Sequence, residues 1–254
     1  MKIRKRLLSA AALGAAATLL LTAGCETIPY PLNPDGPVET VNFTVRIENV
    51  SDGSVLLAPG IWLLHTTDGP LFSDGGMGVL GLEPLAEDGN PFPLTGLNPS
   101  GLAIHLDADP GILYGGVFAA PEGSDTPAPL HAGESYVFNF PAVYGAKLTF
   151  ATMFVHSNDL FYAPSEMGID LFDEQYAVPL KGDVTDMIML WDAGTEVNEE
   201  PGVGPNQAPR QAGPNTGEDE NGVVHLVNDG YVYPPVESAI RVTIMNDKLN
   251  PDNY

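Results

Sequence analysis

Residues 41–50 have the sequence VNFTVRIENV, and this stretch decides the fold class. Apolar side chains stand at every second position from Val41 to Ile47, and polar side chains fill the positions between them. Successive side chains of an extended strand point to opposite faces, so this alternation predicts a strand with one buried and one solvated face. The folded domain is therefore expected to open with a half-buried β-strand.

Seven further stretches of the chain have the composition of strands. They are residues 61–66, 102–106, 114–119, 135–140, 147–155, 187–191 and 239–245. The chain contains 28 glycines and 24 prolines, which disfavour long helices, and only one short helix is expected, between Pro164 and Phe172. The pattern predicts an all-β fold, an antiparallel β-sandwich of about eight strands with long loops.

Two segments are too long to be simple turns. Residues 73–100 are rich in Gly and Pro, and residues 192–222 are rich in Asn, Gly, Pro and Glu with almost no apolar side chains. Long loops in a compact domain are usually functional or disordered. Since no internal repeat or domain boundary is visible, residues 41–247 are interpreted as one domain and residues 248–254 as a C-terminal tail.

The N-terminus has the pattern of a bacterial lipoprotein signal peptide, residues 1–24. Four basic residues lie within the first six positions, an apolar run fills residues 7–24, and small residues immediately precede Cys25. Cys25 is the only cysteine of the chain, which fits a residue kept for lipid attachment. Residues 25–40 are then a lipidated, proline-rich tether, and the protein is expected to be exported and lipid-anchored in the cell envelope, at the outer membrane or the cell surface.

The charge of the mature chain restricts its partners. Removal of residues 1–24 leaves 230 residues with six basic and 33 acidic side chains, a net charge of −27. Such a charge repels nucleic acid and anionic lipid surfaces and favours cations, although a saline habitat would also explain it. No nucleic-acid partner is expected, and the membrane is expected as a partner only through the lipid anchor.

Three short stretches of the chain carry a family resemblance: FATMFVHSNDLF (150–161), LWDAGTE (190–196) and IRVTI (240–244). Together they resemble the spondin N-terminal domain, the module of F-spondin and mindin. Residues 150–161 resemble the family's strand followed by a Ser-Pro-Asp-Trp turn, and residues 190–196 resemble its Trp-Asp-Ala-Gly-Thr-Asp segment. Residues 240–244 are similar to its closing strand, and residues 43–49 fit its opening strand. The resemblance spans most of the predicted domain and is most specific in the Asp-Ala-Gly-Thr segment.

The resemblance implies a C2-like sandwich that binds calcium through loop carboxylates. By position, Asp159, Asp192 and Glu196 correspond to the family's acidic residues, with Glu196 in place of an Asp and Leu160 in place of the usual Trp. The chain lacks the cysteines of the animal members, so their disulfides are not expected. Animal spondin modules bind matrix and cell-surface partners, which implies a role in adhesion or extracellular recognition of a matrix, glycan or cell-surface ligand.

The residues themselves agree in part with a calcium site. Asp159 and Asp192 each follow a predicted strand, and the ends of strands gather at the two poles of a sandwich. Gly194 permits a tight turn that would return Glu196 toward Asp192. Calcium takes six to eight oxygen ligands and relieves the repulsion between confined carboxylates. The alternative is that these residues are ordinary solvated loop acids, as the run Glu218-Asp219-Glu220 is also interpreted.

Other chemistries have weaker support. The five histidines are scattered without metal-binding spacing, and the nucleophile, phosphate-loop and zinc-protease motifs are absent from the sequence, so a non-enzymatic protein is expected. Two alternatives remain open. One is a carbohydrate-binding or hydrolytic envelope lipoprotein that stacks sugars on Trp62, Trp191, Tyr231 and Tyr233, and the other is a purely structural envelope protein.

Overall fold

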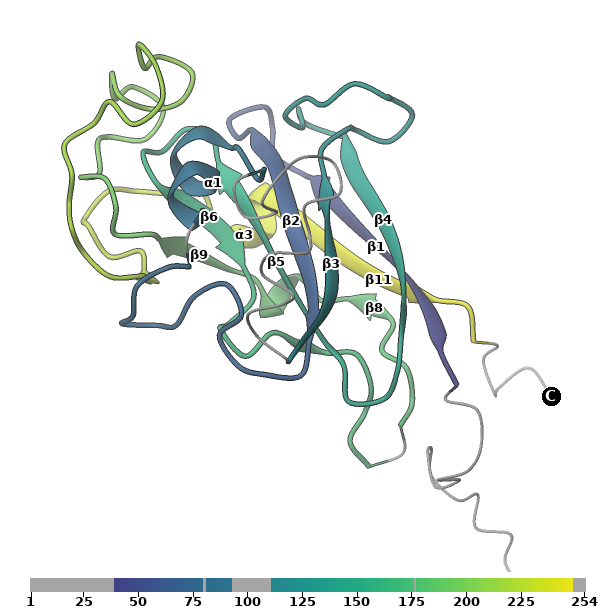
Figure 1. Ribbon diagram of the computed structural model, residues 1–254. Coiled ribbons are helices and arrows are strands. Elements are labelled where there is room, and N and C mark those ends of the chain that lie inside the picture. Colours follow the sequence, from purple (N-terminus) through teal and green to yellow (C-terminus); the bar gives the residue numbers. More distant parts are fainter. Residues whose placement is uncertain (1–38, 80, 93–110, 176, 249–254) are drawn as a thin grey trace, which may run out of the picture.

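The computed structural model describes residues 39–79, 81–92, 111–175 and 177–248, and its strands form two antiparallel sheets (Figure 1). The smaller sheet has the order β4-β1-β11-β8, and the larger has the order β10-β9-β6-β5-β2-β3, with β7 beside β5. The strands are β1 (Val41–Asn49), β2 (Leu57–His65), β3 (Ile112–Phe118), β4 (Ser135–Ala142), β5 (Lys147–Phe154), β6 (Leu160–Ala163), β7 (Ile169–Asp170), β8 (Gly182–Asp183), β9 (Met189–Asp192), β10 (His225–Leu226) and β11 (Ile240–Asn246). The predicted antiparallel β-sandwich is confirmed.

As predicted, residues 41–49 form a strand with one buried face and one solvated face. Val41, Phe43, Val45 and Ile47 are fully buried, whereas the residues between them are exposed or half-buried. β1 lies in the middle of the smaller sheet, paired with β4 on one side and β11 on the other. Its apolar face therefore lies against the larger sheet, and its polar face is turned to solvent.

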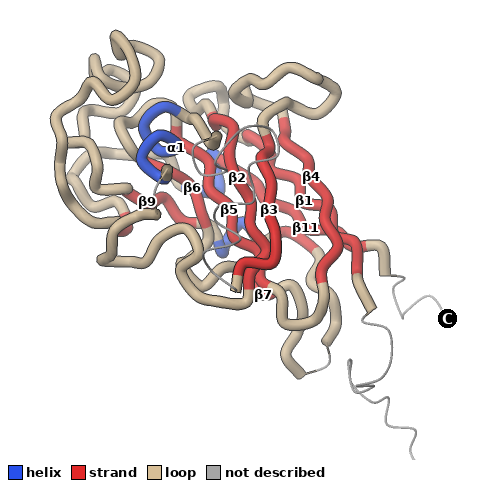
Figure 2. Tube along the Cα trace, in the orientation of Figure 1, coloured by secondary structure: helices blue, strands red, loops and turns tan. Residues whose placement is uncertain are grey.

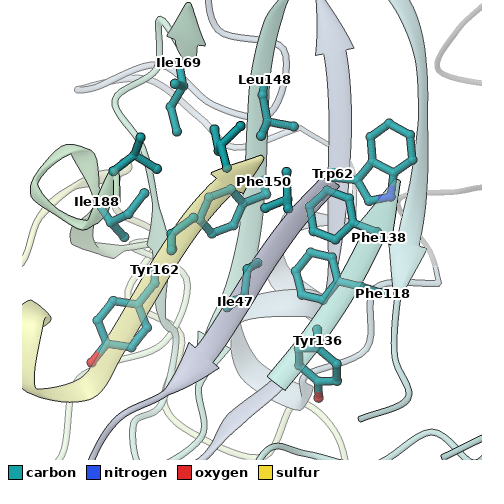
Figure 3. Packing of buried hydrophobic residues seen from close by; sticks show 14 of the residues in the cluster. Ile47, Trp62, Phe118, Tyr136, Phe138, Leu148, Phe150, Tyr162, Ile169 and Ile188 are labelled. Atoms are coloured by element: carbon teal, nitrogen blue, oxygen red, sulfur yellow. The ribbon is translucent and has the colours of Figure 1, made fainter. Parts of the chain in front are cut away.

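Aromatic side chains fill the space between the sheets (Figure 3). Trp62 of β2 stacks on Phe138 of β4 with ring centroids 5.4 Å apart, and Phe138 stacks in turn on Phe118 of β3 at 5.3 Å. Such rings bury large apolar areas, and their stacking adds about 0.5–1.5 kcal/mol per pair. This core fixes the distance and register of the two sheets.

The larger sheet is also covered on its outer face. The helix α1 (Leu82–Asp88) lies beside β5 and β6 (Figure 2). It places Leu82 and Leu85 in a second buried cluster, which includes Phe161 of β6 and Trp191 of β9. This arrangement explains why β6 is buried at all four positions and has no alternation of polar and apolar residues. The segment 73–100, expected to be irregular, thus contributes a helix that forms a third layer.

The predicted strands that lie among the described residues agree with observed strands, whereas the predicted helix does not. Each predicted strand among the described residues overlaps an observed strand, while 102–106 lies outside the described residues. The predicted helix between Pro164 and Phe172 is wrong. Gly168 has φ +74°, a left-handed conformation that interrupts a helix, and Ile169–Asp170 pair with β5 instead.

Two short helical segments lie beside the smaller sheet. They are the 3₁₀ turn η2 (Thr185–Met187) and the one-turn helix α3 (Val236–Ala239), which leads into β11. The signal peptide, Cys25, the tether as far as residue 38 and the tail from residue 249 lie outside the described residues. No described helix has the length and apolar character needed to cross a membrane.

Candidate metal centre

The ends of two neighbouring strands bring Asp159 and Asp192 together. β6 pairs with β9 so that Leu160 lies opposite Asp192, and the N–H of Ala193 donates to the carbonyl of Asp159 over 3.2 Å. The turn before β6 is held by Ser157, whose Oγ accepts a hydrogen bond from the N–H of Leu160. The two aspartates, 33 positions apart in the sequence, thus sit at the same end of the sheet.

Asp159 is fully buried, and its two carboxylate oxygens have different environments. Oδ2 accepts hydrogen bonds from the N–H of Thr195 at 2.8 Å, the hydroxyl of Thr195 at 3.2 Å and the N–H of Glu196 at 3.1 Å. Oδ1 is buried and has no hydrogen-bond partner among the described residues. A buried oxygen without a partner costs about 1–3 kcal/mol, which a bound cation would offset.

Asp192 is also buried, and a tight turn follows it. Its Oδ1 accepts a hydrogen bond from the N–H of Gly194 at 2.7 Å, and its Oδ2 accepts one from Nδ2 of Asn198. Gly194 has φ +68°, and a Cβ at this position would lie 2.5 Å from the carbonyl oxygen of Val223. Both the conformation and the close approach require glycine here.

A short ladder brings a third carboxylate to the pair. The segment after β9 pairs with the end of the long loop: Val197 N–H donates to Glu218 O at 2.8 Å, and Glu220 N–H donates to Thr195 O at 2.9 Å. As a result, carboxylate oxygens of Asp159, Asp192 and Glu220 lie within 4.8 Å of one another. This acidic triad, formed by two buried residues and one exposed residue, could hold a metal ion.

Glu196, the third ligand predicted from the sequence, lies next to the triad in the chain, but its carboxylate is hydrogen-bonded to other residues. The side chain is 3% exposed, and its oxygens accept hydrogen bonds from Asn158 Nδ2 and from the N–H of Gly217. Glu196 approaches Asp159 through its backbone N–H instead. The physical reason is that the side chain of Thr195 contacts Asp159, and neighbouring residues of an extended segment point to opposite faces, so the side chain of Glu196 points the other way.

Electrostatics of the triad favour a positively charged ligand. Burial, reinforced by the charge of Asp192, raises the pKa of Asp159 to about 7. Burial also raises the pKa of Asp192, against the hydrogen bond from Gly194, and raises that of Glu220, where the charge of Asp192 adds to the effect. Without a cation, the negative charges of the three carboxylates repel one another, and burial makes each charge more costly.

A second buried oxygen without a partner lies at the same place. Asn198 donates from Nδ2 to Asp192, whereas its Oδ1 is buried and has no hydrogen-bond partner among the described residues. Asn oxygens are common ligands of hard cations. The sequence analysis did not single out Asn198, and it interpreted Glu220 as part of a solvated acidic run. The ladder between residues 195–197 and 218–220, which brings Glu220 to Asp192, has no signature in the local sequence.

Of the aromatic residues considered for sugar stacking, both tryptophans are buried. Trp62 and Trp191 lie in the two cores, so neither is available to stack a sugar, while Tyr231 is exposed. His225 lies at the triad, 3.9 Å from Asp192. Cys25, the expected lipidation site, lies outside the described residues.

Comparison with protein-family models gives no match for this chain, and comparison with curated proteins gives none either.

Proposed function

We propose that this protein is a calcium-binding, non-enzymatic lipoprotein of the cell envelope that serves adhesion or recognition outside the cell. The observation that carries the proposal is the triad of Asp159, Asp192 and Glu220, in which the buried Oδ1 of Asp159 has no partner. The spondin-like segments support the same assignment, since Asp159 and Asp192 are the positions that match the family's acidic residues.

Calcium suits the chemistry and the shape of the triad. All the nearby side-chain ligands except His225 are oxygens, and Glu220 is exposed, which leaves one side for water or for further oxygens. Ca²⁺ accepts irregular arrangements of six to eight oxygens, whereas Mg²⁺ demands a near-ideal octahedron. The triad and Asn198 would supply four side-chain oxygens and water the remaining ligands, a mixed set that suits Ca²⁺ better than Mg²⁺.

Thermal unfolding tests calcium binding. Because a ligand that binds only the folded state stabilises it by about 2.7 kcal/mol at a hundredfold excess over Kd, Ca²⁺ should raise the Tm by several degrees and a chelator should reverse this. Magnesium at equal ionic strength controls for simple screening of the acidic chain. Equal shifts from the two ions would contradict the proposal.

A pair of variants assigns the effect to the site. Asp192→Asn removes one charge of the triad and should abolish the calcium-specific increment in Tm. Asp125→Asn removes the same charge from an exposed loop position and should leave the increment unchanged. An unchanged increment in Asp192→Asn would place the bound calcium elsewhere.

The position of the site within the fold agrees with recognition outside the cell. β1, which follows the proposed tether, starts at the lower right in Figure 1, whereas β6, β9 and the long loop after β9 lie at the opposite side. A lipid on Cys25 would therefore hold the metal centre and its loop away from the membrane. Cys25→Ser should abolish incorporation of labelled fatty acid and release the protein from membranes, and retained label would refute the lipid anchor.

A further inference from the structure

We propose that His225 is a metal ligand of the same site, and that the site thereby also takes a first-row transition ion such as Mn²⁺ through one nitrogen and the three carboxylates. This inference rests on the proposed metal centre and adds a fourth side chain and a second class of ion to it. The observation that carries it is the orientation of the imidazole ring relative to Asp192.

The pairing of β9 and β10 places the ring. His225 lies directly opposite Asp192 in this antiparallel pair, and its Nε2 is 3.9 Å from Asp192 Oδ2. That distance is too long for a hydrogen bond. Two ligands bound to one ion at 2.0–2.2 Å are separated by roughly 3–3.5 Å, so a small rotation of either side chain would complete the site.

The other ring nitrogen is already occupied. Nδ1 lies 2.9 Å from the carbonyl oxygen of Val223, which can only accept a hydrogen bond. Nδ1 therefore carries a proton, and in the neutral ring Nε2 presents its lone pair on the side of Asp192. A histidine that donates one N–H to a backbone carbonyl and offers the other nitrogen to a metal is the usual arrangement of histidine ligands.

The three carboxylates of the triad all act on this ring. The pKa of His225 is raised by the hydrogen bond to Val223 and then by the negative charges of Asp192, Glu220 and Asp159. The ring thus shares one electrostatic environment with the proposed ligands. Because the side chain of His225 is 39% exposed, it can turn toward a bound ion without repacking the core.

The nitrogen changes which ions the site prefers. Calcium and magnesium select oxygen ligands, whereas imidazole nitrogen suits Mn²⁺, Zn²⁺ and other first-row ions. Calcium is therefore expected to use the carboxylates and water without His225, and Mn²⁺ is expected to bind His225 as well. The two modes are distinguishable because only one of them contains a metal–nitrogen bond.

Electron spin echo spectroscopy of Mn²⁺ bound to the full chain tests the metal–nitrogen bond directly. The expected spectrum has ¹⁴N modulation typical of a coordinated imidazole. Labelling the protein with [¹⁵N]histidine should replace this modulation by the ¹⁵N pattern, without any change in sequence. A bound Mn²⁺ whose spectrum has no histidine nitrogen would overturn the inference.

A variant then assigns the nitrogen to one residue. His225→Gln should remove the modulation and weaken Mn²⁺ binding about tenfold or more, while calcium affinity changes less than about twofold. His131→Gln, at an exposed loop position, serves as the matched control and should keep the modulation. Modulation that persists in His225→Gln overturns the assignment, whereas a failure of the chain to bind both ions overturns the proposed function too.

Discussion

The backbone N–H of Glu196 donates a hydrogen bond to Oδ2 of Asp159 over 3.1 Å, while the carboxylate of Glu196 accepts hydrogen bonds from Asn158 and Gly217. The two residues are thus joined through the backbone of one and the side chain of the other. Under the proposed function, Glu196 orients Asp159 through its backbone N–H and does not contact the ion. Glu220 supplies the third carboxylate of the triad. This division of roles separates the effects of substitutions at the two glutamates.

Glu220→Gln should weaken calcium binding about tenfold or more, because it removes one of the three charges that face the ion. Its effect on the metal-free fold should be small, since Glu220 is exposed and its removal relieves repulsion from Asp192. Isothermal titration calorimetry measures the affinity, and denaturant unfolding measures the stability.

Glu196→Gln should have the opposite signature. The buried carboxylate accepts two hydrogen bonds, and an amide replaces one acceptor by a donor, so unfolding free energy should fall by about 1–3 kcal/mol. Calcium affinity of the folded fraction should change by less than about twofold. A large loss of affinity with unchanged stability would make Glu196 a ligand after all.

Calcium affinity should depend on pH below neutrality. Burial and the neighbouring charge of Asp192 raise the pKa of Asp159 to about 7, so below this pH the ion must displace a proton. The dissociation constant should rise roughly tenfold per pH unit below 7, the dependence expected for one displaced proton, and become constant above it. Calorimetry at pH 6 in buffers of different ionisation enthalpy should detect about one released proton, and release of none would argue against Asp159 as a ligand.

The strands that could be predicted from the sequence have either alternation, as in β1, or a long run of strand-forming residues, as in β5, which is buried almost throughout. β1 has alternating polar and apolar residues because only one of its faces is buried, so its sequence alone identifies it as a strand. β6 is buried on both faces, so its sequence Leu-Phe-Tyr-Ala has no alternation. The helix α1 has only seven residues, too few for a helical periodicity to emerge from the surrounding glycines.

The same distinction applies to the metal centre. Asp159 and Asp192 were predictable because each adjoins a strand, and strand ends meet at a pole. Glu220 depends on the ladder between the start and the end of a long polar loop, and no local pattern specifies that register. His225 was passed over because a single histidine has no metal-binding spacing; only its pairing opposite Asp192 gives it significance.

Glu87 should make the metal-free fold more stable in acid than at neutral pH. This residue of α1 is 4% exposed, and burial raises its pKa to about 7, with a further contribution from the charge of Glu196. The unfolded chain has a pKa near 4.3, so between about pH 4.3 and 7 the folded state holds a proton that the unfolded state has lost. The contribution of this proton to the free energy of unfolding is therefore fully present below about pH 4.3 and is lost as the pH rises to 7.

Denaturant unfolding in chelator at pH 5 and pH 8 measures this effect. Glu87→Gln should match the wild type in acid and exceed it at pH 8 by on the order of 2–3 kcal/mol, because the neutral amide needs no ionisation. Glu237→Gln, at an exposed position of α3, removes the same charge away from Glu87 and should leave the pH dependence unchanged. Identical pH profiles for Glu87→Gln and the wild type would show that Glu87 ionises normally.

Gly194→Ala should disrupt the metal centre through the backbone alone. A Cβ at this position would lie 2.5 Å from the carbonyl oxygen of Val223, and the residue has φ +68°. Left-handed backbone at a non-glycine residue costs about 1–3 kcal/mol, and the clash pushes residues 222–223 away from the turn. The shift would also move Glu220, so calcium affinity should fall together with stability.

Gly213→Ala is the matched control, because a Cβ there has no atom within 4 Å and the site is in the same loop. This variant should be as stable as the wild type, or slightly more so, and should bind calcium normally. Denaturant unfolding and calorimetry on the two variants make the comparison. If Gly194→Ala unfolds like Gly213→Ala and keeps its calcium affinity, the turn after Asp192 does not set the position of the third carboxylate.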